Sequence, residues 1–430
     1  MSIYNSILKP DYFDKFACSA SACPYTCCQD WAITIDKNTY NKYKAVKDKA
    51  FQEKVGMYVK RNKGDNVHNS VYAAMSLCES GLCGFYDETG LCSIHRRFGH
   101  GYLSHTCKVY PRQYCNTTPG VLECSLTMSC PEVARLALLN PEPVSFDLEP
   151  LKSGTLMTDV IINRRLNPEN DYYPYAWQIR EACVDIMQNR DHSIAERIFI
   201  IGFMLDKLTR LHDEGGVDKY NETLAGFLAG VEHGEFSGLL GSFTENKELT
   251  ENLTVVLMTG LIKRGVSANR AANFFKLFGD LVVANLPESD VTITRNEDGK
   301  IQSMTMDPRF ANDFISSKRA YFDEFLDGYS YILENYFVNY MFTSIFPFTY
   351  ISQGHTPYQH FIALAEQYAV FRMMMCVITD NKPITPELAV DIICSVARNK
   401  QHSTSSKEIA ETYINSDTGS LAYISFLIRK

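Results

Sequence analysis

The sequence predicts an α+β protein that is predominantly α-helical, with an irregular, cysteine-rich, metal-binding N-terminal domain followed by a helical body that carries a small β-hairpin. Three observations predict this fold class. Eleven of the fourteen cysteines lie between Cys18 and Cys130. Apolar residues recur with helical spacing through most of the chain beyond residue 155. Two alternating runs within residues 291–307 flank Asp298 and Gly299, a pattern typical of a β-hairpin.

The bulk composition limits the domain number and the partners. A chain of 430 residues exceeds the size of about 250–300 residues at which a single core stops growing. We therefore expect a cysteine-rich metal or iron–sulfur cluster domain at residues 1–140 and a mostly helical domain at residues 156–430. The net charge is −8 and no long basic run occurs, which argues against a nucleic-acid partner. The sequence leaves the oligomeric state open.

Two further patterns concern location. The first residues lack a positive segment followed by an apolar segment, so we expect a cytoplasmic protein. The most apolar stretch, residues 329–348, contains Glu334 and ends near Pro347, which favours a buried aromatic helix over a membrane span. We therefore expect no association with a membrane.

The N-terminal elements follow from local patterns. Residues 31–37, WAITIDK, alternate apolar and polar side chains like a short strand. Residues 38–61 have the apolar spacing of one charged amphipathic helix. Residues 62–129 show no sustained period, so we expect loops whose backbone is fixed by metal bonds rather than by a hydrophobic core.

A helix is expected over residues 131–139, because Pro131 suits the first helical turn, where its missing N–H costs nothing. Cys130 would then lie at a helix N-terminus, where the helix dipole favours a thiolate. Residues 140–155 have the composition of a linker. Beyond it, helical patterns cover about 175–190, 194–214, 218–233, 247–264, 266–285, 309–345, 356–378 and 386–399.

The crowding of cysteines predicts a metal site. In a reducing compartment such crowding is explained better by metal ligation than by disulfides. The spacings are short enough for neighbouring thiolates to share one ion or cluster: Cys18-x4-Cys23-x3-Cys27-Cys28, then Cys78, Cys83-x8-Cys92, Cys107-x7-Cys115, Cys124 and Cys130. Tetrahedral thiolate sites suit both zinc and iron–sulfur clusters, so spacing leaves the metal open.

Other residues near these cysteines have two interpretations each. Three histidines in this region are either ligands of a mixed site or partly exposed loop residues: His95, His100 and His105. Four basic residues either offset the charge of a thiolate-ligated cluster or are solvated: Arg96, Arg97, Lys108 and Arg112. The remaining cysteines, Cys183, Cys376 and Cys394, are expected to pack between helices.

At this point the sequence resembles a known family. Cys83-Gly-Phe-Tyr-x5-Cys92-Ser-Ile-His and Cys107-Lys-Val-Tyr-Pro-Arg112 resemble a YkgJ-like zinc- or iron-chelating domain. More narrowly, the chain resembles the flagellin lysine N-methylase (FliB-type) family. The supporting segments are Cys18 to Cys28 with Trp31, then Glu123-Cys-Ser-Leu-Thr-Met-Ser-Cys-Pro-Glu-Val-Ala-Arg135, and finally Glu334-Asn-Tyr-x2-Asn-Tyr-x5-Phe-Pro347.

The resemblance implies an enzyme that transfers methyl groups from S-adenosylmethionine to lysine side chains of flagellin and carries an iron–sulfur cluster, most simply [4Fe–4S]. It also implies a set of candidate ligands: Cys18, Cys23, Cys27, Cys28, Cys83, Cys92, Cys107 and Cys130. A single [4Fe–4S] cluster needs four, so some are structural or a second metal is present. The catalytic residues and the methyl-donor site stay unassigned.

Two departures from known adenosylmethionine enzymes bear on the mechanism. Cys27 is followed directly by Cys28, so the spacing does not match the Cys-x3-Cys-x2-Cys motif of radical enzymes. No glycine-rich turn follows a predicted strand as in Rossmann methyltransferases. The competing hypothesis is a non-catalytic, zinc-stabilised protein that binds a partner or delivers metal, because structural zinc can supply folding energy by itself.

Overall fold

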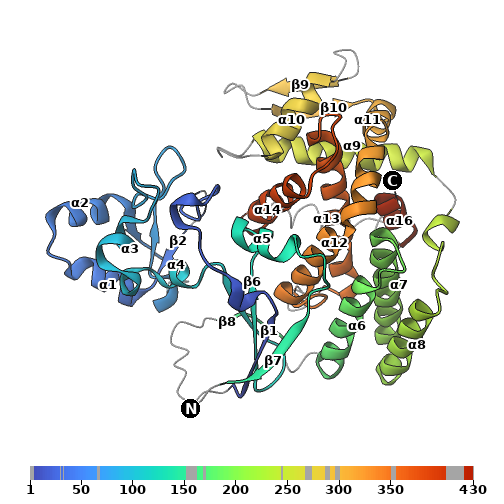
Figure 1. Ribbon diagram of the computed structural model, residues 1–430, viewed down its shortest axis with the longest axis horizontal. Helices are drawn as coiled ribbons and strands as arrows, with labels where there is room; N and C mark the ends of the chain where they lie inside the picture. Colours follow the sequence, from blue (N-terminus) through green and yellow to red (C-terminus); the bar gives the residue numbers. More distant parts are fainter. Residues whose placement is uncertain are drawn as a thin grey trace.

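The computed structural model describes residues 4–29, 31, 33–64, 68–151, 162–167, 171–243, 246–266, 274–285, 291–295, 301–349, 355–402 and 421–429. A small N-terminal part lies at one side of the molecule and a larger helical body at the other, with a mixed β-sheet against the body (Figure 1). The predicted fold class, α+β with a predominance of helix, is confirmed.

The strands are β1 (Ser6–Pro10), β2 (Ile33–Ile35), β3 (Val59–Arg61), β4 (Ala73–Met75), β5 (Arg112–Asn116), β6 (Val121–Leu126), β7 (Phe146–Pro150), β8 (Ile162–Arg165), β9 (Val291–Arg295) and β10 (Ile301–Met306). The helices of the N-terminal third are α1 (Lys37–Ala45), α2 (Lys49–Tyr58), α3 (Ser93–Phe98), α4 (His105–Val109) and α5 (Pro131–Leu138). The helices of the body are α6 (Ala176–Gln188), α7 (Ile194–Asp213), α8 (Tyr220–Glu232), α9 (Lys247–Val266), α10 (Phe274–Asn285), α11 (Pro308–Ser316), α12 (Arg319–Ser344), α13 (Pro357–Ile378), α14 (Pro386–His402) and α16 (Leu421–Arg429).

The small N-terminal part has its own core. Strands β2, β4 and β3 form an antiparallel sheet, and α1 to α4 surround it. The core side chains include Ile33, Tyr43, Phe51 and Phe85. The single helix expected over residues 38–61 is wrong, because the chain breaks into α1, α2 and β3.

Two aspartates explain that break. Asp36 caps α1 by accepting a hydrogen bond from the backbone N–H of Thr39, at 2.9 Å. Asp48 starts a second helix in the same way, accepting from the N–H of Phe51 at 2.7 Å. A side chain that satisfies the orphan N–H groups of a helix start makes a new start favourable within a continuous amphipathic pattern.

A five-stranded sheet of order β7-β1-β6-β5-β8 was not expected from the sequence. Strand β1 runs parallel to β6 and antiparallel to β7, and β5 pairs antiparallel with β6. The loop-rich prediction for residues 62–129 is therefore wrong at β5 and β6, and the linker prediction for 140–155 is wrong at β7. Alternation in such short strands, three to six residues long, is too brief to be recognised against irregular backbone.

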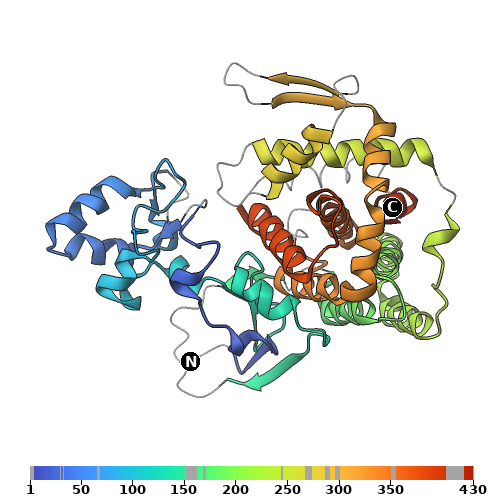
Figure 2. The ribbon, with the colours of Figure 1, turned by 45° about the horizontal axis from the view of Figure 1, so that its top comes forward.

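The body follows the sequence patterns more closely. Helices α6, α7, α8, α9, α13 and α14 begin and end close to the predicted limits. The stretch expected as one helix over 309–345 is divided into α11 and α12, and α10 begins at Phe274. The predicted hairpin is confirmed as β9 and β10, which extend at the edge of the helical body (Figure 2), whereas its turn at Asp298 and Gly299 lies outside the described residues.

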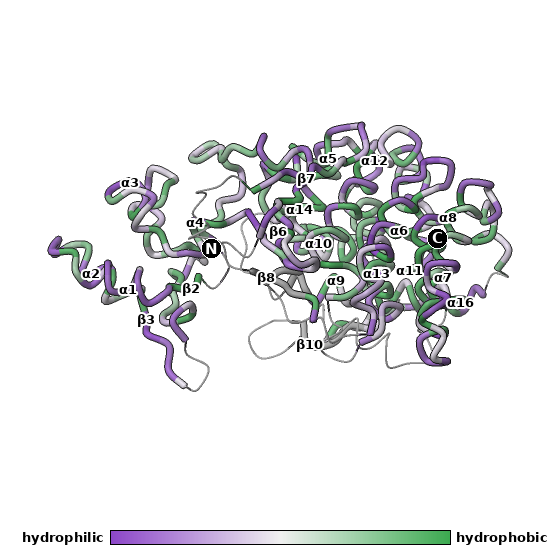
Figure 3. Tube along the Cα trace, turned by 90° about the horizontal axis from the view of Figure 1, so that it is seen from below, coloured by the Kyte–Doolittle hydropathy of each residue, from purple (hydrophilic) through white to green (hydrophobic). Residues whose placement is uncertain are grey.

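Hydropathy differs between the parts, with α1 largely hydrophilic and α13 largely hydrophobic (Figure 3). Among the described helices, α13 alone is long and apolar enough to cross a membrane, and every residue of that apolar window is buried inside the protein. Burial on all sides explains why α13 has no polar face.

The third segment that carries the family resemblance, on α12, joins the body to the sheet and to α5. The side-chain amide of Asn335 donates to the carbonyl of Ala137 at 3.1 Å and to that of Asn140 at 2.8 Å. The amide of Asn339 donates to the Tyr12 hydroxyl and, at 3.1 Å, to the carbonyl of Leu126. These buried amides fix the helix against backbone that would otherwise lack hydrogen-bond partners. Sheet and helices consequently share one large core.

Candidate metal centre and a neighbouring pocket of aromatic and acidic residues

Four of the predicted ligands pack in the core of the small part: Cys28, Cys83, Cys92 and Cys107. We refer to them as the inner set. Three loops and a helix bring them together. The N–H of Cys83 donates to the carbonyl of Cys28 at 2.7 Å. Cys92 precedes the first residue of α3, and Cys107 lies in the first turn of α4, whose cap is Ser104.

The inner set is electrostatically coupled. Burial, with smaller contributions from the neighbouring sulfurs of Cys92, Cys27 and Cys83, raises the pKa of the Cys107 thiol to about 12. Burial likewise raises the pKa of Cys83 to about 11, again with a contribution from Cys92. Ionised cysteines would repel one another in a desolvated core, so their thiols stay protonated unless a cation is present. A metal would reverse this balance, because thiolates bind the metal and release their protons.

The other four predicted ligands lie where the small part meets the helical body: Cys18, Cys23, Cys27 and Cys130. Cys130 precedes α5, as predicted, and the nearby charges of Cys23 and Cys27 raise its pKa after the larger effect of burial. Cys394 of α14 joins this second set. Its thiol donates to the carbonyl of Ser129 at 3.7 Å, and Cys130 and Cys23 raise its pKa after burial.

Cys27 and Cys28 connect the two sets. The Cys28 thiol donates a hydrogen bond to Cys27, which lowers the pKa of Cys27 and raises that of Cys28. The guanidinium of Arg398 on α14 also lowers the pKa of Cys27 and donates to the carbonyl of Thr26 at 2.5 Å. The adjacent pair thus places one thiol toward the inner set and one toward the body.

The donor chemistry suits a thiolate-ligated centre, but the geometry does not form a single-ion site. Within the part of the chain that the structure describes, no three Cys, His, Asp or Glu side chains converge as ligands of one metal ion. Zinc requires sulfur atoms at about 2.3 Å from one point. An iron–sulfur cluster distributes its thiolates over several irons, so its ligands stand further apart. The inner set has the number of thiols that a [4Fe–4S] cluster needs.

Three of the four neighbouring basic residues, Arg96, Arg97 and Arg112, are engaged elsewhere. Arg96 pairs with Asp87 and Arg97 pairs with Asp48, each at 2.7 Å. Arg112 lies over the ring of Phe16, with its guanidinium 5.4 Å from the ring centroid. These contacts favour the solvated or structural interpretation over charge compensation of a cluster. The rings of His95 and His100 lie on the exposed side of α3 and just after it, 6.3 Å apart.

Four of the five remaining cysteines have structural surroundings, whereas Cys78 lies near the candidate ligand Cys83 and raises its pKa. The thiol of Cys115 donates to the carbonyl of Thr343 at 3.7 Å, which joins β5 to α12. Cys124 is buried in β6, and Cys183 and Cys376 are buried in α6 and α13 as expected. Sequence reasoning missed Cys394 as a neighbour of the candidate ligands, because its only local signal is an apolar helix position.

Gly84 is required by packing inside the candidate centre. A Cβ atom at this position would lie 2.1 Å from Cγ of the Tyr58 ring. We expect Gly84→Ala to lower the free energy of unfolding by about 1–3 kcal/mol, because the ring must move within a packed core. Urea denaturation of the metal-free protein measures this, and Gly56→Ala on the exposed side of α2, where a Cβ meets no atom, is the control. An unchanged unfolding midpoint for Gly84→Ala would contradict the packing argument.

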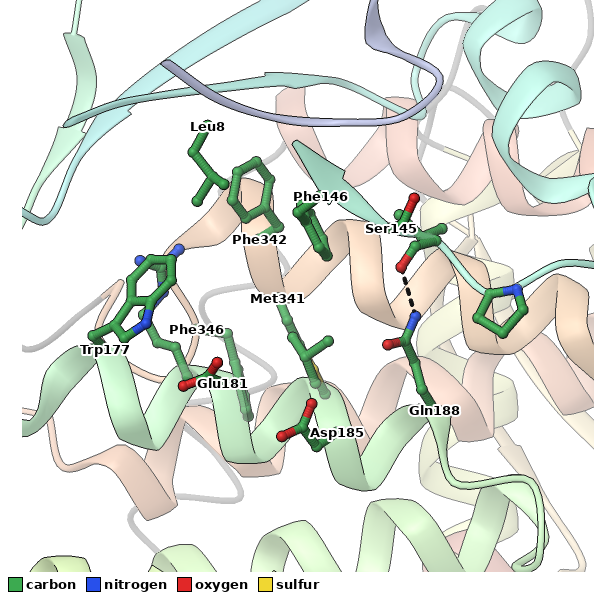
Figure 4. Close-up of a pocket in the computed structure, with 14 residues that line it drawn as sticks. Leu8, Ser145, Phe146, Trp177, Glu181, Asp185, Gln188, Met341, Phe342 and Phe346 are labelled. Carbon is green, nitrogen blue, oxygen red and sulfur yellow. Dashed lines mark hydrogen bonds between the residues drawn. The ribbon is translucent and has the colours of Figure 1, made fainter. Parts of the chain in front are cut away.

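A pocket of about 520 Å³ lies between α6, the C-terminal end of α12, β1 and the start of β7. Trp177, Glu181, Val184, Asp185 and Gln188 line it from one face of α6. Opposite them lie Leu8, Phe146, Met341, Phe342 and Phe346 (Figure 4). The amide of Gln188 donates to the carbonyl of Val144 at 2.8 Å and so ties α6 to the chain before β7.

Arg180, the one basic residue among the described residues that line the pocket, is neutralised. Arg180 forms a bidentate ion pair with Glu123 of β6, with N···O distances of 2.9 and 2.6 Å, and also donates to the Thr117 hydroxyl at 2.8 Å. Both charged side chains are almost completely buried. Glu123, which opens the second segment of the family resemblance, therefore holds α6 against the sheet. The pocket is left with two acidic residues and several aromatic rings.

Comparisons with known proteins agree with the resemblance to a lysine N-methylase. The family described as the FliB lysine N-methylase C-terminal domain matches residues 180–427. A protein named lysine-N-methylase from Salmonella choleraesuis (strain SC-B67) is 33% identical over 153 residues, which cover 36% of this chain and 37% of the relative. The lysine-N-methylase of Salmonella typhimurium (strain LT2) is 32% identical over the same coverage.

A shorter relative, flagellar biosynthetic protein FliU of Salmonella muenchen, is 34% identical over 140 residues, 33% of this chain and 81% of the relative. The matched region spans a little over a third of the two lysine-N-methylases. No solved structure matches this chain. The family match begins at Arg180, so the cysteine-rich segments lie outside it and their likeness to a YkgJ-like domain stays a prediction.

Proposed function

The chain belongs to the FliB lysine N-methylase family, and on that premise we propose that it is a protein-lysine N-methyltransferase that uses S-adenosylmethionine to methylate flagellin in the cytoplasm. The observation that carries the proposal is the family match over residues 180–427, which includes α6 from Arg180 onward and all of α12, on two sides of the pocket. The names of the relatives support both lysine methylation and a flagellar role.

Methyl transfer sets requirements that these residues must meet. The neutral lysine amine forms a bond to the methyl carbon, the bond from that carbon to the sulfonium sulfur breaks, and a thioether and a methylated ammonium result. A free lysine has a pKa of about 10.4 and is protonated at neutral pH, so the site must hold the ammonium and accept its proton. An apolar pocket lined by two exposed carboxylates, those of Glu181 and Asp185, meets the first requirement, because it attracts the cation and packs its alkyl stem.

We propose that the inner set holds an iron–sulfur cluster, most simply [4Fe–4S], through Cys28, Cys83, Cys92 and Cys107. When bound, the cluster supplies redox-active iron and fixes the loops of the small part. The second set, Cys18, Cys23, Cys27 and Cys130, lies near α14, whose Arg398 and Cys394 donate to the carbonyls of Thr26 and Ser129. Zinc bound to the same thiols, with no catalysis, is the alternative.

The proposal is tested with the full-length protein purified without oxygen. We expect iron and labile sulfide in the preparation and transfer of labelled methyl groups from S-adenosylmethionine to lysines of flagellin, located by peptide mass spectrometry. Flagellin with its lysines acetylated is the matched control, because it keeps the fold of the substrate and removes the amines. A colourless preparation with stoichiometric zinc and no methyl transfer would instead support the non-catalytic alternative.

A further inference from the structure

The pocket between α6 and α12 has the charge and shape of a receptor for an alkyl ammonium ion. We propose that it binds the side chain of the substrate lysine, with the ammonium group beside Glu181 and Asp185 and the alkyl stem among the aromatic rings. This assignment rests on the proposed lysine methylation. It names the residues that recognise the amine, which neither the family match nor the relatives specify.

The charge of the pocket is the first argument. Glu181 and Asp185 are one turn apart on α6, and both carboxylates lie along its pocket side (Figure 4). Within the described ranges of the chain, no lysine, arginine or histidine forms an ion pair with either of them. Arg180 cannot do so, because Glu123 and Thr117 occupy its guanidinium. Two carboxylates without a counter-ion favour a cationic ligand.

The second argument is the environment of Asp185. Desolvation raises its pKa, and the neighbouring carboxylate of Glu181 raises it further. A cation between the carboxylates of Asp185 and Glu181 offsets both the desolvation of Asp185 and its repulsion by Glu181. A carboxylate held in this way also accepts a proton more readily than a solvated aspartate does, which suits an amine that must become neutral before it attacks.

The apolar walls fit the rest of a lysine side chain. The rings of Phe146 and Phe342 are 4.6 Å apart between centroids, and Met341 and Leu8 lie beside them. A four-carbon stem packs against such surfaces while its charged end reaches the carboxylates. Trp177 is 41% exposed at the rim, and the Arg180 guanidinium already lies over its ring, 5.8 Å from the ring centroid.

The same charges argue against the methyl donor as the occupant. S-adenosylmethionine carries a carboxylate of its own, which needs a cationic or N–H partner. In this pocket that carboxylate would meet Glu181 and Asp185, and the lining arginine is already paired. A volume of about 520 Å³ accommodates a lysine with its flanking backbone, so the side chain of a protein substrate can enter from the open side.

Tryptophan fluorescence gives a direct test, because the chain has only two tryptophans. In the Trp31→Phe variant, Trp177 is the only tryptophan, so all tryptophan emission comes from the pocket. In the Trp177→Phe variant, the pocket contains no tryptophan. We expect an acetylated, amidated peptide with a central lysine to change the emission of Trp31→Phe, with no change for the norleucine peptide of equal stem length and none in Trp177→Phe. A response of equal size to norleucine, or to S-adenosylmethionine alone, would overturn the assignment.

Charge removal completes the test. The double variant combines Glu181→Gln with Asp185→Asn. In the Trp31→Phe background it should raise the Kd for the lysine peptide about tenfold or more. In the otherwise unchanged chain it should raise the KM for flagellin by a similar factor. Glu222→Gln, at an exposed acidic position in the first turn of α8, is the matched control and should change neither. Circular dichroism and iron content of the double variant show whether the fold and the metal centre are retained.

The two proposals fail in different ways. If wild-type protein methylates flagellin and the correctly folded double variant does so with unchanged KM, the pocket assignment is wrong and the proposed function stands. If the lysine peptide binds at Trp177 but no methyl transfer occurs with the iron-loaded protein, the proposed function is wrong and the pocket remains a lysine-binding site.

Discussion

Replacing Cys107 by Ala is expected to remove iron, labile sulfide and visible absorbance from the protein and to reduce flagellin methylation to background. Cys107 lies in the small core with Cys28, Cys83 and Cys92, and its pKa is raised by burial and by the nearby sulfurs of Cys92, Cys27 and Cys83. Loss of one thiolate leaves one iron of a [4Fe–4S] cluster without a protein ligand, and metal binding and folding are coupled in small metal-stabilised units. Iron and sulfide analysis and a methyl-transfer assay on anaerobic protein measure both effects.

Cys376→Ala is the control, because this cysteine is buried on α13 among the apolar residues of the large core and is not one of the candidate ligands. It should keep its iron and its activity, with at most a modest loss of stability. A colourless Cys107→Ala protein that retained full methyl transfer would show that the metal centre has no part in catalysis. A Cys107→Ala protein with unchanged iron would show that this thiol is not a ligand.

Replacing Glu334 by Ala is expected to lower the free energy of unfolding by about 3–5 kcal/mol, because it leaves buried positive charge without a partner. The Glu334 side chain is 1% exposed and accepts from Arg197 at 2.7 Å and from Arg190 at 2.9 Å. Arg197, at 4% exposure, also donates to the carbonyls of His192 and Met187. These bonds join α12 to the segment between α6 and α7. Urea denaturation followed by circular dichroism measures the loss.

Asp280→Ala provides the comparison, because Asp280 also pairs with a basic residue, Lys276 at 2.8 Å, but both side chains are well exposed. Solvent screens that pair, so its removal should change the unfolding midpoint very little. If Glu334→Ala and Asp280→Ala shifted the midpoint equally, the buried network would not be the structural link that its geometry indicates.

Long periodic stretches made most of the helical body predictable. Helix α7, for example, repeats its apolar pattern over five turns, so the periodicity stands above local variation. The N-terminal third was predicted less well. Strands β1, β5 and β6 are short; β1 pairs with β6, which is distant in sequence, and β5 pairs with β6 across a short connection. Strand propensity and apolar–polar alternation over five residues do not reveal which segment a strand will pair with.

The candidate metal centre was also predictable from the sequence only in part. Cysteine spacing was sufficient to predict a thiolate centre, and the resemblance supplied eight ligands. Spacing could not divide those eight into a set inside the small core and a set against α14, nor could it identify Cys394 as a neighbour. Choosing between the two interpretations of Arg96 and Arg97 also required the structure, because their acidic partners, Asp87 and Asp48, are 9 and 49 residues away in the chain. The domain boundaries near residues 140 and 156 stay a prediction.

By itself, the sequence determined that this protein is mostly helical, that its N-terminal third concentrates thiols able to bind a metal, and that it belongs with the lysine N-methylases of the FliB family. Only the tertiary structure decided which thiols share a core and which residues surround the pocket. It also decided that Arg180 is neutralised by Glu123, which leaves Glu181 and Asp185 as the charge of that pocket. The physical reason is that periodicity and ligand chemistry are encoded locally, whereas burial and charge pairing depend on residues that meet only when the chain folds.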